Sequence, residues 1–132
     1  MPEEGGRRTI PFPQHSNVVM HSECRAELIS LIHEGEIPEF IAAYEQRIGF
    51  LSRNLGKETI YHPKWFEVLK KAQGLRSVHF VTFRNLRILY VVENSKAFLL
   101  LAFEERQGHK NTEYSKFIDP ALKRLGDKER ML

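Results

Sequence analysis

The chain has 132 residues, of which 42% are hydrophobic and 28% charged, and this length and composition are typical of one globular domain. Its longest apolar run, AFLLLAF at residues 97–103, is far too short to cross a membrane, and the N-terminal residues lack the apolar core of a secretory signal. With Cys24 as the single cysteine, an internal disulfide and a zinc site built from several thiolates are both excluded. These features predict a cytoplasmic protein without membrane contact.

The first third of the chain predicts an arm, a short strand and a helix. Residues 1–16 hold two glycines and three prolines, so we expect a flexible N-terminal arm, followed by a single domain over residues 17–132. The apolar residues of NVVM, at 17–20, suit a first strand. Ser22 is the predicted N-cap of a helix whose apolar residues recur at helical spacing until Gly35.

A second helix is predicted from Pro38 to Gly56, because its apolar residues follow the 3.6-residue period. The break between the two helices is so short that we expect them to form an antiparallel hairpin. The next segment, residues 64–71 (KWFEVLKK), predicts a short helix or turn that directs its aromatic residues inward.

Three apolar segments at residues 74–103 then predict a β-meander. The polar break ENSK, at residues 93–96, suits a tight hairpin between the second and third strands. Apolar residues from Tyr114 to Leu125 recur at helical spacing, and Pro120 within them predicts a kink, or a restart capped by Asp119. The predicted fold is therefore α+β: a small antiparallel sheet with the helical hairpin packed on one face and a C-terminal helix.

The charge is unevenly distributed along the chain. Residues 1–69 hold 7 Lys/Arg against 10 Asp/Glu, whereas residues 70–132 hold 13 against 7. A basic half that coincides with the sheet indicates a polyanionic ligand. Segregation of charge by chance is the alternative interpretation.

Enzyme motifs with a fixed spacing, such as a phosphate-binding glycine loop or HExxH, do not occur, and the six histidines lack metal-ligand spacing, so we expect neither a metal nor a cofactor. What remains is a set of side chains in the sheet half. The predicted catalytic residues are Arg76, His79, Arg87, His109, Lys110 and Tyr114, and the predicted RNA-binding residues are Arg84 and Arg106.

These residue types suit RNA cleavage without a metal. A base removes the proton from the ribose 2′-OH, which attacks the adjacent phosphorus; cations stabilise the phosphorane, and an acid protonates the leaving 5′ oxygen. Arg76 and His79 are three residues apart on one strand, so they are expected on opposite faces. Arg87 lies among apolar residues, where a guanidinium must be paired or face a solvated groove.

Each candidate also has a structural alternative. Arg87 can pair with a core carboxylate such as Glu93 or Glu104, and His79 can be an ordinary strand residue. The bases of the loop at residues 106–110 can simply be solvated. Tyr114 belongs to the apolar stripe of its helix, which favours packing in the core.

The order of motifs LRS, RNLRILYVV, AFLLLAFEERQGHKNTEY and an ALKRL-type helix, over about residues 65–125, resembles the RelE/HigB-like toxins of type II toxin–antitoxin modules, in their phage-derived branch. This resemblance implies a small α+β domain that cleaves mRNA on the ribosome and is neutralised by a cognate antitoxin. It also implies that Arg76 and Arg87 are the strand arginines of the family, that Tyr114 is its aromatic residue near the last helix, and that Arg106, His109 and Lys110 are its loop bases.

The chain departs from this pattern at two places. Glu104 and Glu105 stand where relatives often have paired lysines, and Leu86 stands where an aromatic residue is usual. The two glutamates are expected to weaken RNA binding unless they point away or pair with Arg106. They therefore favour, as the alternative function, a ParE-like or catalytically degenerate member of the fold that binds a protein target or only its antitoxin. A small RNA-binding module is the third possibility.

Overall fold

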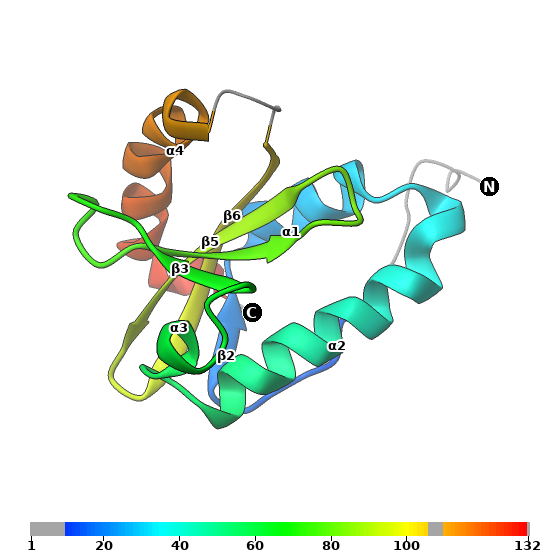
Figure 1. Ribbon diagram of the computed structural model, residues 1–132, viewed down its shortest axis with the longest axis horizontal. Helices are drawn as coiled ribbons and strands as arrows, with labels where there is room; N and C mark the ends of the chain where they lie inside the picture. Colours follow the sequence, from blue (N-terminus) through cyan, green and yellow to red (C-terminus); the bar gives the residue numbers. More distant parts are fainter. Residues whose placement is uncertain (1–9, 106–109, 132) are drawn as a thin grey trace.

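The computed structural model of the protein describes residues 10–105 and 110–131. In chain order its elements are strand β2 (Val18–Met20), helix α1 (Ser22–Leu31), a 3-10 turn (Glu34–Glu36), helices α2 (Ile37–Arg53) and α3 (Glu58–Tyr61), strands β3 (Phe66–Val68), β4 (Arg76–Phe80), β5 (Leu86–Glu93) and β6 (Lys96–Glu104), helix α4 (Lys110–Leu125) and a second 3-10 turn (Lys128–Arg130). The strands form one sheet in the order β2-β6-β5-β4-β3 (Figure 1). The predicted α+β class is confirmed.

The centre of the sheet is the predicted meander. β4, β5 and β6 are antiparallel neighbours, and Asn94 and Ser95 connect β5 to β6 with positive φ angles of 54° and 61°. This geometry is that of a two-residue hairpin turn, so the hairpin predicted at ENSK is confirmed. The strand predicted at residues 17–20 is confirmed as β2. The sheet is mixed and not purely antiparallel as predicted, because β2 adds in parallel to β6, and it gains β3, which adds antiparallel to β4.

The prediction of a helix or turn at residues 64–71 is wrong for Phe66–Val68, although residues 64–65 and 70–71 on either side do form turns. Phe66 pairs with Val78 and Val68 with Arg76, which makes this segment the edge strand β3. A run of so few apolar residues fits the helical and the extended period equally well. Pairing with β4, a partner ten residues away, decides between them.

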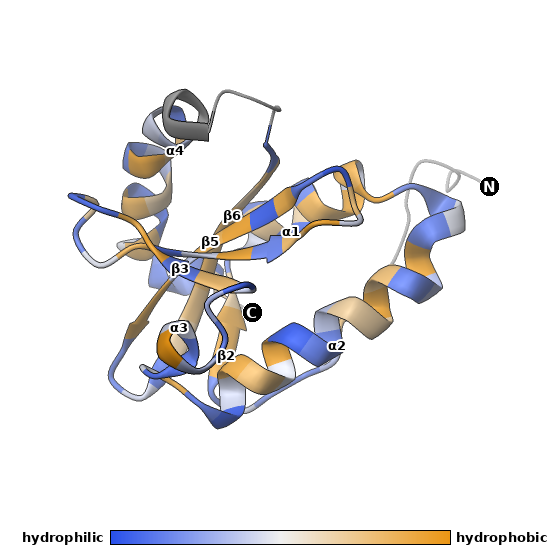
Figure 2. Cartoon of the chain, in the orientation of Figure 1, coloured by the Kyte–Doolittle hydropathy of each residue, from blue (hydrophilic) through white to orange (hydrophobic). Residues whose placement is uncertain are grey.

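Two cores lie on the two faces of the sheet. On one face, Val78, Phe80, Ile88 and Leu99 pack against α1 and α2, and on the other, residues including Leu89, Leu101 and Phe103 pack against α4. Figure 1 accordingly shows α2 and α4 on opposite sides of the sheet, and Figure 2 shows apolar and polar bands along both helices. The helical hairpin and the C-terminal helix therefore cover opposite faces.

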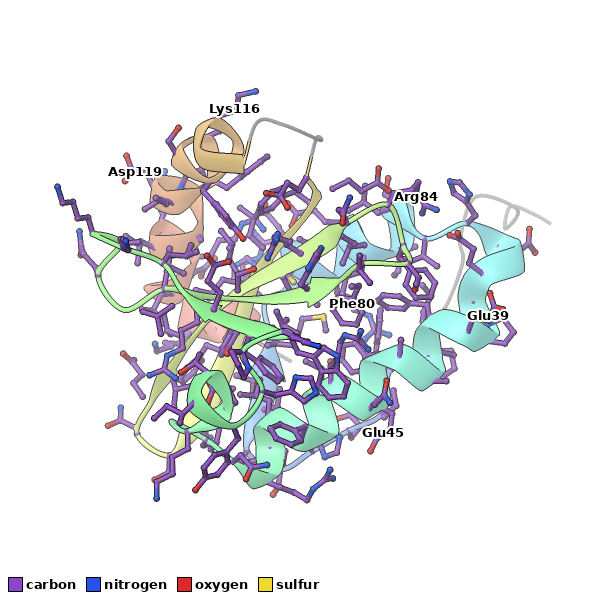
Figure 3. All side chains as sticks on the ribbon, viewed as in Figure 1. Glu39, Glu45, Phe80, Arg84, Lys116 and Asp119 are labelled. Atoms are coloured by element: carbon purple, nitrogen blue, oxygen red, sulfur yellow. The ribbon has the colours of Figure 1, made fainter. Side chains whose placement is uncertain are left out.

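The two helices of the predicted hairpin diverge across their face of the sheet. α1 packs on β6, whereas α2 packs on β4 and β3, with the ring of Phe40 5.2 Å from that of Phe80 (labelled in Figure 3) and Phe50 6.0 Å from Phe66. α1 begins at Ser22, but its N-cap is His21 and not Ser22 as predicted, since His21 Nδ1 accepts a hydrogen bond of 3.0 Å from the Glu23 amide. An imidazole nitrogen thus replaces the hydroxyl that the usual preferences favour.

Helix α4 runs through Pro120 as one element, so the predicted restart with Asp119 as cap is wrong. Proline removes only one N–H from the helix ladder. Pro120 lies on the exposed side, as does Lys116 one turn earlier, where water can bind the carbonyl that has lost its donor. Among the described residues, no helix is both long and apolar enough to cross a membrane.

Beyond the end of β2, the ion pair between Glu27 and Arg124 binds the backbone edge of β6. β2 pairs with Ala97–Leu99, and in the described part of the chain no strand neighbours the next residues of β6 on that side. The Ala102 amide instead donates to Glu27 at 3.0 Å, and Arg124 donates to the Leu100 carbonyl at 2.9 Å and to Glu27 at 2.7 Å. Side chains from α1 and α4 thereby satisfy an otherwise open strand edge.

We expect an Arg124→Ala variant to lose about 2 kcal/mol of unfolding free energy, because the Leu100 carbonyl and the Glu27 carboxylate both lose a charged donor. The neighbouring Lys123 is exposed, so Lys123→Ala is the matched control and is expected to change stability by less than about 0.5 kcal/mol. Urea denaturation of both variants measures the difference. Equal midpoints for the two would show that the Glu27–Arg124 bridge contributes nothing.

Candidate functional site

A polar cluster lies on the face of the sheet that α4 covers. Strand alternation projects Ser77 and His79 of β4 to the same side, and His79 lies directly opposite Arg87 in the β4–β5 register. Glu67 of β3 lies opposite Ser77. The Arg87 cluster, as we name it here, consists of Glu67, Ser77, His79, Arg87, Glu105 and Tyr114.

Arg87 is the centre of this cluster and is only 7% exposed. Its Nε donates to Glu105 Oε1 at 2.8 Å, its Nη1 donates to Ser77 Oγ at 3.3 Å, and the same Nη1 lies 3.6 Å from Glu67 Oε1. The expectation that a buried guanidinium here must be paired is confirmed, but the main partner is Glu105 and not Glu93 or Glu104. Consecutive strand residues point to opposite faces, so Glu105 reaches Arg87 and Glu104 does not.

Tyr114 covers Arg87 from α4. It lies in the second turn of the helix, and its ring is 5.5 Å from the guanidinium carbon of Arg87. Its hydroxyl lies 3.3 Å from Ser77 Oγ and 3.4 Å from Glu67 Oε1, either of which can accept its single proton. Burial raises the pKa of Tyr114 well above its ordinary value, so the phenol keeps its proton. The residue therefore combines the predicted core packing with a donor aimed into the cluster.

His79 is half-buried beside Arg87. Its Nε2 lies 3.0 Å from Asn85 Oδ1, an acceptor, which assigns the ring proton to Nε2 and leaves a lone pair on Nδ1. Burial, and then the positive charge of Arg87, lower the pKa of His79 below its ordinary value of 6.5. The imidazole is therefore neutral at physiological pH, as a general base must be.

The cluster opens to solvent on the β3 side. A groove of about 530 Å³ runs beside β3 and is lined by Trp65, Glu67, Val68, His79 and Arg87 among others. This volume lies in the range of small-molecule and cofactor pockets. A phosphodiester in the groove would meet the imidazole and the guanidinium together.

The prediction that Arg76 and His79 lie on opposite faces is confirmed, which separates Arg76 from the cluster. Arg76 donates to Glu58 at 2.6 Å on the α2 face, where the Tyr90 hydroxyl also donates to Glu58 at 2.7 Å. Glu58 is completely buried. These contacts give Arg76 a structural role as the counter-ion of a buried carboxylate.

Arg84 lies at the tip of the β4–β5 turn (Figure 3) and is also bound to carboxylates. It donates to Glu36 at 2.7 Å, to Glu104 at 2.9 Å and to the Leu31 carbonyl at 2.9 Å. The hydrogen bonds from Arg84 and from the His33 amide lower the pKa of Glu36 to about 2. Glu104 thus forms an ion pair with Arg84, just as Glu105 forms one with Arg87.

The predicted loop bases are Arg106, His109 and Lys110. Arg106 and His109 lie outside the described residues. Lys110 is the first residue of α4, and its side chain lies outside what the structure describes. Their predicted roles stay predictions.

The sequence alone did not identify three members of the site. Glu67 lies in the segment for which the sequence predicts a helix or turn, and Glu105 is predicted only as a carboxylate that weakens RNA binding unless it points away or pairs with Arg106. Ser77 has a signal that could have found it, because it is two residues from His79 and so shares its face. Asn85, which orients His79, has a positive φ of 57° in the turn that follows β4.

We expect His79 to titrate below pH 6.5 in an NMR titration of the folded protein, and an Arg87→Met change to raise its pKa by removing the nearby positive charge. Asn85→Gly, which tolerates the positive φ, is expected to lower it further by removing the hydrogen bond. Because the unfolded chain binds this proton more tightly, the linked stability is present above about pH 6.5 and is lost as the pH falls. A pKa above 6.5 would contradict the neutral base.

Among the described residues, no group of three His, Cys, Asp or Glu side chains could hold a metal ion. No protein-family model matches this chain, and no curated protein matches its sequence. The site must therefore be interpreted from its own chemistry.

Proposed function

We propose that this protein is an endoribonuclease that cleaves mRNA on the ribosome without a metal, as the toxin of a type II toxin–antitoxin pair in the cytoplasm. The observation that supports this proposal most is the meeting of His79 and Arg87 in one solvent-connected groove, with the Tyr114 ring packed 5.5 Å from the Arg87 guanidinium carbon. The resemblance of the motif order to RelE/HigB-like toxins supports it independently. The cognate antitoxin is the expected protein partner.

The roles follow from the charge states of the cluster. Neutral His79 accepts the 2′-OH proton on Nδ1, while the Arg87 guanidinium binds the phosphate and stabilises the added charge of the phosphorane. The protonated Tyr114 hydroxyl donates a second hydrogen bond to a phosphate oxygen. We assign the acid that protonates the leaving 5′ oxygen to His109 or Lys110, which are both among the catalytic residues predicted from the sequence.

RNA must displace a carboxylate to reach Arg87. Glu105 already accepts from its Nε, and Glu67 lies near its Nη1. A bound phosphate takes over these donors only by moving one carboxylate, which subtracts from its binding free energy. Contacts with the rest of the ribosomal complex have to supply the free energy that moving this carboxylate costs.

The same pairing favours the second candidate function. Arg76, Arg84 and Arg87 all bind glutamates, so the positive charge of the meander is largely neutralised within the fold. A ParE-like or catalytically degenerate protein, which binds a protein target or its antitoxin and leaves RNA intact, is consistent with this arrangement.

A ribosome-dependent cleavage assay with wild type, His79→Ala and His109→Ala separates the two functions. The proposal expects cleavage by the wild type and a loss of about 100-fold or more in each variant. Arg130→Ala is the control, because Arg130 is an exposed arginine that binds Glu23. Growth arrest by the wild type without mRNA loss would overturn the nuclease and support the second candidate.

A further inference from the structure

No strand of residues 10–105 or 110–131 pairs with the outer edge of β3. β3 is the last strand of the sheet. The His79 amide donates to the Trp65 carbonyl, and the Leu69 amide donates to the Leu75 carbonyl, so the backbone groups of the odd-numbered residues of this segment face β4. The amide and carbonyl of Val68 therefore point away from the sheet. An edge of this kind can accept a further strand.

Apolar side chains gather at this edge. In the part of the chain that the structure describes, four large apolar residues are exposed, and three of them, Ile60 (73%), Tyr61 (57%) and Val68 (51%), belong to α3 and β3. α3 lies directly beside β3. An added strand would therefore gain apolar contacts as well as backbone hydrogen bonds.

The surroundings of this edge are basic. Lys57, Lys64, Lys70 and Lys71 are exposed, and none of them forms an ion pair with another described residue. Lys64 lines the groove of about 530 Å³ on one side of Val68, and Lys70 lines a second groove of about 350 Å³ on the other side. Glu58 is buried against Arg76, whereas Glu67, which lies 3.6 Å from Arg87, is 38% exposed and lines both grooves, so the exposed lysines outnumber the one carboxylate that lines the grooves.

We propose that β3 binds an extended, acidic segment of a partner protein as a sixth strand. The alternation of backbone groups and apolar side chains suits a peptide strand better than RNA. Two copies of this chain that paired through β3 would bring the same four lysines of each copy together, and their repulsion would oppose the pairing. Acidic residues of a partner would instead complement these lysines. The first groove also holds His79 and Arg87, so a bound segment covers the Arg87 cluster. Binding itself does not depend on RNA cleavage.

Trp65, the only tryptophan, lines the first groove and reports on this binding by its fluorescence. We would titrate the full-length protein with a short capped peptide of alternating glutamate and valine, and with a matched peptide of alternating lysine and valine. The acidic peptide is expected to bind at least about tenfold more tightly at low salt, and added salt is expected to reduce the difference. Equal affinity for the two peptides, or binding of neither, would overturn the proposal.

Two sets of variants localise the peptide. Val68→Pro removes an outward amide that β4 does not use, and is expected to weaken binding about fivefold, whereas Val68→Thr keeps the amide and is the control. The double variant Lys64→Glu/Lys70→Glu is expected to bind the basic peptide more tightly than the acidic peptide. It tests the proposal even if the Val68→Pro variant does not fold. Binding that ignores both sets, dimers that form through this edge in sedimentation, or RNA that binds here in place of the acidic peptide would each overturn the proposal.

Discussion

An Arg76→Ala variant is expected to lose about 3 to 5 kcal/mol of unfolding free energy, because it leaves the charge of Glu58 buried without a counter-ion. Glu58 is completely buried, and its Oε1 has no hydrogen-bond partner even with Arg76 in place. The loss is a large share of the stability of an ordinary domain. Urea denaturation near neutral pH measures it.

The matched control is Arg76→Ala/Glu58→Gln, in which both charges of the pair are removed. It is expected to recover most of the loss, since the glutamine is neutral and can still accept from the Tyr90 hydroxyl. Cleavage by Arg76→Ala, at a temperature where the variant is folded, is expected to stay within about threefold of wild type. A loss of cleavage comparable to that of the His79 variant would instead place Arg76 in the chemistry, as the sequence predicts.

An Arg87→Ala variant is expected to reduce cleavage by about 100-fold to 1000-fold, because it removes the cation placed to stabilise the phosphorane. Its unfolding free energy is also expected to fall by about 2 kcal/mol, since Glu105 is nearly buried and its Oε2 already lacks a partner. Single-turnover cleavage and urea denaturation separate the two effects.

Glu105→Gln provides the companion measurement. Glutamine keeps an acceptor for Arg87 Nε but removes the charge that competes with phosphate, so RNA affinity is expected to rise. Cleavage is then expected to equal or exceed that of wild type. If Glu105→Gln abolishes cleavage while the protein stays folded, Glu105 takes part in the reaction instead of opposing RNA.

Local pattern was sufficient for the elements with long periodic stretches. The alternation in β4 placed Arg76 and His79 on opposite faces, and the composition of ENSK located the hairpin. It failed at β3, whose three residues carry too few positions to distinguish the two periods. It also failed to name the partners of Arg84 and Arg87, because those glutamates come from other elements.

The sequence by itself determined the α+β class, the meander, the two N-terminal helices and the segregation of positive charge into the sheet half. Only the tertiary structure decided what that charge does. Strand register brings Glu105 and Glu67 to Arg87, helix packing brings Glu36 to Arg84, and α3 buries Glu58 beneath Arg76. Ion pairs between residues far apart in the chain depend on distances that only the folded chain sets. A basic stretch in the sequence thus becomes a set of arginines paired with glutamates, of which Arg87 lines the groove beside β3.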